Sequence, residues 1–128
     1  MKRLISAAGA VFGLLLIAAP AQAQMGNAPE GHEMTVTGQV IDISCKFGHG
    51  LAGDQHRMCS QVCADKGIPL AILTSEGELL IPVSEGMPGE SENGRLREFA
   101  EQTVTIHGTV YEAGGAKVIK IESVSRSS

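Results

Sequence analysis

Short apolar runs alternate with turn-forming residues over most of this chain. The segment 34–43 is rich in β-branched residues and partly alternates between apolar and polar positions. Two further apolar runs, 69–74 and 78–83, are separated by a Ser-Glu-Gly turn. The segment 103–111 alternates cleanly, and a Gly-Gly turn leads from it to a partner run at 117–124. This pattern predicts five β-strands, the last four forming two hairpins.

Two stretches have a helical rather than an alternating pattern. Asp54 is a favourable helix N-cap, and residues 55–66 are compatible with a helix throughout. Gly67 and Pro69 then provide the stop. Within 96–100, apolar residues fall at i, i+3 and i+4, which is typical of a short helix with one apolar face. We therefore expect one helix of about three turns and one short helix.

The order of these elements indicates a fold class. A helix between the third and fourth of five strands is the order of a small Greek-key barrel of the OB type. We predict a mainly β domain over residues 34–125, with the short helix just before strand 4. Residues 44–67 form an insertion between strands 1 and 2, a connection that commonly contacts ligands in this barrel.

The N-terminus has the layout of a cleavable export signal. A short basic start precedes an apolar run at 4–19, and Ala21-Gln22-Ala23 supplies small residues for a signal peptidase. We predict a signal peptide over residues 1–23, a disordered leader over 24–33 and a periplasmic location. No later segment of the sequence is long and apolar enough to suggest a membrane span.

Charge and aromatic content exclude one class of partner. The net charge is −4, and the chain has no Trp and one Tyr. Such a protein lacks both the basic surface and the stacking aromatics that nucleic acid requires. We expect the partner to be a metal ion or another periplasmic protein.

The residues with reactive or metal-binding side chains are concentrated in one place. All three cysteines lie between Cys45 and Cys63, together with two of the four histidines. An odd cysteine count in an exported protein leaves one thiol without a disulfide partner unless a metal or another protein takes it. This concentration makes the insertion the candidate functional site.

The first interpretation is a site for a soft metal ion. On the predicted helix, His56, Cys59 and Cys63 fall at i, i+3 and i+7 and share one face. Cys45 and His49 lie in a glycine-rich segment that can fold over the ion. Thiolate and imidazole ligands suit copper or zinc, and we expect binding rather than catalysis.

Two acidic residues near these ligands complete the predicted metal site. Asp42 and Asp54 can orient the histidines by accepting hydrogen bonds from them.

Two other interpretations stay open. A Cys45–Cys59 or Cys45–Cys63 disulfide would pin the helix to strand 1 and contribute roughly 3 kcal/mol in the chain-entropy model. Alternatively, Cys59 lies near a helix start beside Arg57, where a thiolate is favoured, and could serve thiol–disulfide exchange. Against that redox role, the sequence contains no Cys-x-x-Cys motif.

Two parts of the chain together resemble a set of small exported bacterial proteins. The segment 103–124, preceded by the short helix, looks like the closing half of bacterial periplasmic OB-fold proteins. The insertion matches a cysteine–histidine signature carried by Ser44, Cys45, Gly48, His49, Gly50, Gly53, His56, Cys59, Cys63, Gly67 and Pro69. The resemblance implies the barrel and export, and it carries no activity to particular residues.

Overall fold

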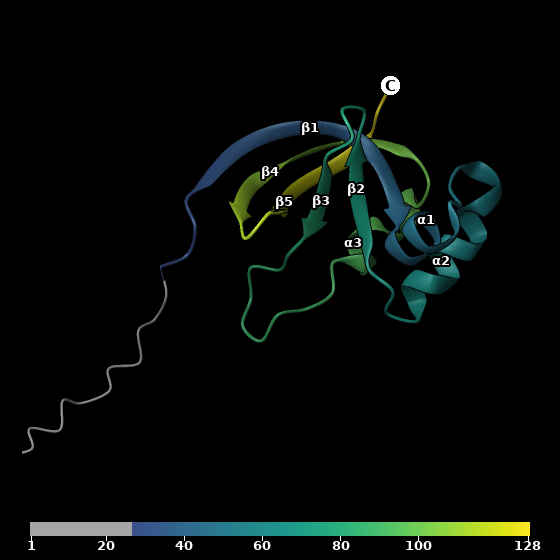
Figure 1. The fold of residues 1–128 in the computed structure, drawn as a ribbon, viewed down its shortest axis with the longest axis horizontal. Coiled ribbons are helices and arrows are strands. Elements are labelled where there is room, and N and C mark those ends of the chain that lie inside the picture. The colour runs from purple at the N-terminus through teal and green to yellow at the C-terminus, as the bar shows by residue number, and fades with distance from the viewer. Residues whose placement is uncertain (1–26) are drawn as a thin grey trace, which may run out of the picture.

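The five predicted strands close into one barrel. A computed structural model describes residues 27–128. Figure 1 shows the strands curving around a common interior, with the helices gathered away from the β4–β5 turn. The strands are β1 Gly31–Asp42, β2 Leu70–Thr74, β3 Leu79–Pro82, β4 Thr103–Ala113 and β5 Ala116–Arg126.

Closure depends on the long strand β1 and on one parallel pair. β1 pairs antiparallel with β2 through its C-terminal half and with β4 through most of its length. β2 pairs with β3, and β4 pairs with β5, both antiparallel. The parallel pairing of β3 with β5 completes the order β1-β2-β3-β5-β4. The predicted class, a small OB-like barrel with a helical insertion, is therefore confirmed.

The helices lie in the two predicted connections. Between β1 and β2 are α1 Ile43–His49, the 3-10 turn η1 Asp54–His56, and α2 Arg57–Asp65. Before β4 are α3 Asn93–Leu96 and the 3-10 turn η2 Arg97–Phe99. Within the described residues, none of these helices has the length and apolar character needed to cross a membrane.

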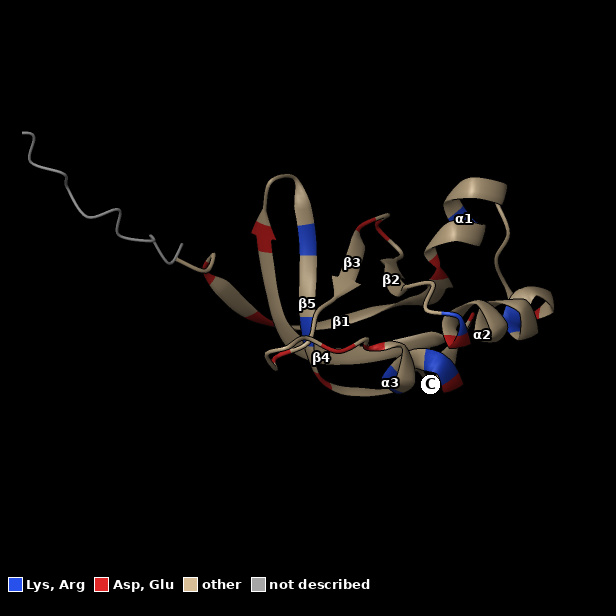
Figure 2. Ribbon diagram, turned by 90° about the horizontal axis from the view of Figure 1, so that it is seen from below, with Lys and Arg blue, Asp and Glu red and all other residues tan. Residues whose placement is uncertain are grey.

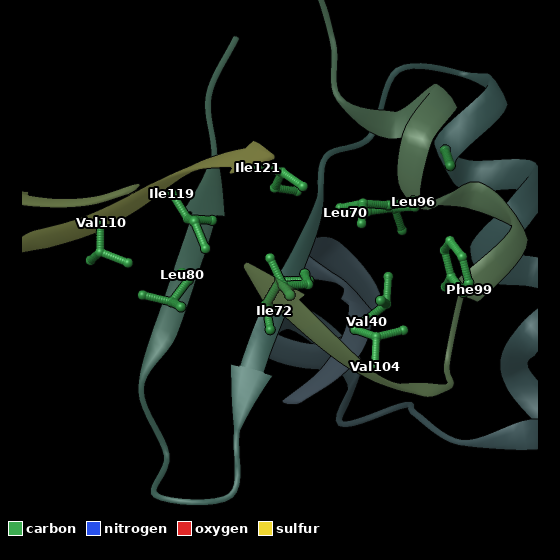
Figure 3. Close-up of a cluster of buried hydrophobic side chains, with 12 residues drawn as sticks. Val40, Leu70, Ile72, Leu80, Leu96, Phe99, Val104, Val110, Ile119 and Ile121 are labelled. Carbon is green, nitrogen blue, oxygen red and sulfur yellow. The ribbon is translucent and has the colours of Figure 1, made fainter. Parts of the chain in front are cut away.

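The core is formed by the inward positions of the strands and closed at one end by a helix. Leu96 of α3 and Phe99 of η2 are buried against Val40, Leu70 and Val104. Figure 3 shows these residues on one side of the cluster and Val110, Leu80 and Ile119 on the other. The apolar face predicted for 96–100 thus serves to plug the barrel.

Three boundaries differ from the sequence-based expectation. β1 begins at Gly31, so residues 31–33 are strand where the pattern predicted a leader. Cys45 lies in helix α1 rather than in an irregular loop. The single helix predicted over 55–66 is divided into η1 and α2. The predicted signal peptide, 1–23, lies outside the described residues.

Candidate metal centre

Asp42 fixes the first helix of the insertion to the end of β1. Its side chain is fully buried, and Oδ1 accepts a hydrogen bond of 3.0 Å from the Cys45 amide. An aspartate in extended conformation that accepts from the third helical residue is a favourable N-cap. The cap therefore starts α1 and holds Cys45 in its first turn.

Gly50 and Gly53 carry the chain from α1 to α2. Both have positive φ values, 69° and 95°, which side chains other than glycine rarely adopt. The Gly53 amide donates a 2.7 Å hydrogen bond to Oε2 of Glu101, which is only 3% exposed. This contact ties the connecting segment to the barrel just before β4, and His56 follows three residues later.

Contacts from α2 to α3 and η2 fix the second helix. Asp65 forms a bidentate ion pair with Arg97, with distances of 2.6 and 2.8 Å. The Asn93 side chain donates to the carbonyls of Ala64 and Ile68 and accepts from the Leu70 amide. The end of α2 is thereby joined to the start of β2.

These supports bring four of the five predicted ligands into two groups that share Cys45. The three sulfur atoms of Cys45, Cys59 and Cys63 all lie within 4.8 Å of one another. A second group with the same spacing contains Asp42, Cys45 and His56. Cys45 belongs to both groups, so it is the centre of the arrangement.

Two of the predicted residues are in neither group. His49 is the last residue of α1 and is exposed. Because α1 is helical up to His49, the glycine-rich segment does not fold it over the cysteines. Asp54 is the exposed first residue of η1, whereas Asp42 is part of the site.

The cluster is shielded on the barrel side and reachable from solvent. All three cysteines are free thiols, Cys59 exposed and the other two half-buried. Neither of the disulfides considered from the sequence is formed in the structure.

A buried carboxylate controls the protonation of the thiols. Burial raises the pKa of Asp42, but hydrogen bonds from the Cys45 amide and from the neighbouring thiols outweigh burial and leave it below its ordinary value. The Asp42 carboxylate, aided by desolvation, raises the pKa of Cys63 to about 12. Desolvation and then Asp42 raise the pKa of Cys45 as well. Both thiols are therefore protonated at neutral pH, and a metal ion would have to displace their protons.

Two buried polar atoms at this site lack an ordinary hydrogen-bond partner among the described residues. They are Oδ2 of Asp42 and Nε2 of His56. The thiols of Cys45 and Cys63 lie near enough to the carboxylate to lower its pKa. Neither thiol, however, makes a hydrogen bond of regular geometry to Oδ2. Buried polar groups without partners are costly, so both atoms are free to serve a ligand placed between them and the sulfurs.

The chemistry of these donors fits a soft ion. Two sulfur atoms bound tetrahedrally to one zinc ion lie about 3.8 Å apart, given Zn–S bonds of about 2.3 Å. The three sulfurs lie within 4.8 Å of one another, a range that includes this separation. Three thiolates and one imidazole form a common set for zinc, and a sulfur-rich set also suits Cu⁺.

Glu101 is the functional residue that the sequence did not reveal. It lies two residues after η2, and no pattern in the sequence around it distinguishes it from the exposed glutamates of the chain. Its φ of 61° places it in the left-handed region, and its amide donates to the Val40 carbonyl. Only the fold shows that its carboxylate anchors the segment that leads to His56.

Comparison of the chain with protein-family models, with curated proteins and with solved structures finds no match.

Proposed function

We propose that this protein is an exported binder of a soft metal ion, copper or zinc, and that it holds the ion without catalysis. Cys45, Cys59 and Cys63 supply thiolates, and His56 supplies an imidazole. The observation that carries the proposal is the convergence of three thiols to within 4.8 Å of one another, with His56 grouped at the same spacing with Cys45 and its Nε2 unpartnered among the described residues. The N-terminal sequence supports export to the periplasm.

Asp42 affects ion binding in two opposing ways. Its buried carboxylate has a lowered pKa and stays ionised, so it attracts a cation at short range. The same carboxylate raises the pKa of Cys63, and desolvation and the carboxylate together raise the pKa of Cys45, so Asp42 opposes the loss of the thiol protons. Binding therefore requires that the ion displace these protons.

The exposure of Cys59 favours a protein that exchanges its metal ion with a partner over one that stores the ion permanently. A structural zinc ion is held by a closed set of protein ligands, whereas a solvent-exposed ligand permits exchange. Cys59 is exposed, while Cys45 and Cys63 are half-buried. An incoming thiol or imidazole can reach the ion from the Cys59 side, so we expect the ion to pass to and from another periplasmic protein.

The direct test is metal analysis of protein recovered from the periplasm after expression with its own leader. We expect about one copper or zinc ion per chain, and loss of that ion in the Cys59→Ser/Cys63→Ser double variant. After chelation under denaturing conditions, the native protein should show three free thiols. One free thiol and no bound metal would contradict the proposal. N-terminal sequencing of the same sample should begin at Gln24.

Thiol–disulfide exchange is the second candidate, favoured by the exposed Cys59 beside two other thiols. In that reaction the Cys59 thiolate attacks a disulfide of a partner protein and releases one partner thiolate. Cys45 or Cys63 then attacks the mixed disulfide, which oxidises this protein and reduces the partner. Exchange with a model disulfide that is lost in Cys59→Ser, in a protein purified without metal, would favour this function.

A further inference from the structure

The inward face of β1 continues beyond the packed core. Even-numbered residues of this strand face the barrel interior, as buried Val40 shows. Toward the start of the strand, inward Val36 is half-buried and Met34 is 44% exposed. The barrel interior is therefore not filled at the end far from the insertion.

A cavity of about 310 Å³ occupies this open end. Its apolar floor consists of Val36, Leu80 and Val110, with Met34 at the side. Leu80 and Val110 are themselves buried. In Figure 3 they lie on the side of the core away from the plug residues Leu96 and Phe99. Among residues 27–128 no helix covers this end, because both helical connections lie at the other.

Charged residues form a collar above the apolar floor. Each of these residues occupies an inward-facing position of its strand or lies just beyond the end of the strand. They are Glu30, His32, Glu78, Glu112 and Lys117. Figure 2 shows acidic segments at the end of β4 and in the β2–β3 turn, with a basic segment on β5. We call these five residues the collar.

The charges of the collar do not cancel. Lys117 contacts Glu78 and lies 3.9 Å from Glu112. One ammonium group thus faces two carboxylates, and Glu30 has no ion-pair partner among the described residues. The collar therefore keeps an excess of negative charge, which disfavours an anionic ligand.

We propose that this cavity binds a small organic cation, namely an ammonium compound with an apolar body. The apolar part lies on Val36, Leu80 and Val110, and the ammonium group lies at the collar near Glu30 and Glu112. A cavity near the lower limit of known ligand pockets, with an apolar floor and a few charged groups, suits such a ligand. The site is independent of the cysteine cluster and of the proposed metal binding.

The test uses phenethylammonium as the probe and amide NMR spectra of the purified full-length exported chain. We expect saturable shifts of amides in 32–36, 78–80 and 110–117. The matched control is 3-phenylpropionate, which has a similar apolar body and the opposite charge, and it should bind several-fold more weakly. Equal binding of the two probes, or shifts spread over the helical end, would overturn the proposal.

Two single substitutions at the collar should change the affinity for phenethylammonium in opposite directions. Glu112→Gln removes an attractive charge and should weaken phenethylammonium binding about two- to fivefold. Lys117→Met removes the competing cation and should strengthen binding by a similar factor. Changes in the same direction in both variants would contradict the charge argument. Amide shifts at the collar that depend on protein concentration without probe would show a second copy there, and would also overturn it.

Discussion

The two ends of the barrel are built from the same alternating strands but are completed differently. At the helical end, Leu96 and Phe99 fill the interior, and the insertion covers the outside. At the open end, the inward positions become charged around a cavity. A filled end excludes water, so a carboxylate such as Asp42 acts strongly on adjacent thiols. At the open end the carboxylates that face Lys117 are 42% and 67% exposed, so these ion pairs are correspondingly weak.

The largest expected effect is on the free energy of unfolding, and it distinguishes the packing at the two ends of the barrel. Leu96 is fully buried in the plug, so Leu96→Ala should lower the free energy of unfolding by about 2–5 kcal/mol. Leu80 is almost as buried but borders the cavity, where water can fill the space that Leu80→Ala creates. Leu80→Ala should therefore be less destabilising. Urea unfolding followed by circular dichroism measures both, and equal losses would show that the ends are packed alike.

A smaller effect distinguishes the two histidines of the insertion. His56 shares a group with Cys45 and Asp42, whereas His49 is exposed and in neither group. We expect His56→Ala to weaken metal binding about 10- to 100-fold, because one ligand of the set is lost. His49→Ala is the matched control and should bind as the native protein does. Competition with a chromophoric chelator measures both affinities, and the reverse order would refute the assignment.

A third substitution tests whether Glu101 positions the site. Glu101→Gly removes the carboxylate that accepts from Gly53 and also relaxes the left-handed backbone. We expect metal affinity to fall about tenfold, since the segment leading to His56 loses its anchor. Glu101→Gln keeps a hydrogen-bond acceptor and should retain most of the affinity.

The thermal stabilities of the two Glu101 variants provide the control. A positioning role predicts that affinity and melting temperature change independently. An affinity loss that merely follows the melting temperature in both variants would indicate a structural role instead.

The smallest effect concerns the open end and depends on pH. The hydrogen bond to Glu78 raises the pKa of Lys117 above its ordinary 10.5. A raised lysine pKa means that the charged form stabilises the folded state below the ordinary value, and that this contribution is lost as pH rises past the raised one. The difference in urea midpoint between native protein and Lys117→Met should therefore stay constant up to about pH 10 and shrink above about pH 10.5. A difference that grows over this range would contradict the ion pair.

The barrel could be predicted from the sequence because its signals are local and repeated. Alternation in 103–111, glycine-containing turns and the apolar face of 96–100 each define an element without reference to the rest of the chain. Helix α1 was missed because Gly48 and Gly50 weaken its helical signal. The buried cap from Asp42 supplies what local propensity lacks.

The site was predicted as a set of residues but not as an arrangement. Helical spacing correctly placed Cys59 and Cys63 together, since it depends on one element. The choice between His49 and His56 depends on where the chain turns at Gly50 and Gly53, and on an anchor at Glu101. Such contacts between residues distant in the sequence leave no pattern in either segment.

The pairing of β1 with β4 also has a consequence for the order of folding. β1 and β4 come from opposite ends of the domain, so the contacts that close the barrel are among its least local. The three thiols come from one short stretch. Because local contacts form faster than distant ones, we expect the thiols to meet before the barrel closes. During that interval they lack the shelter of the plugged end, so the folding chain passes through a stage in which its cysteines are most open to oxidation.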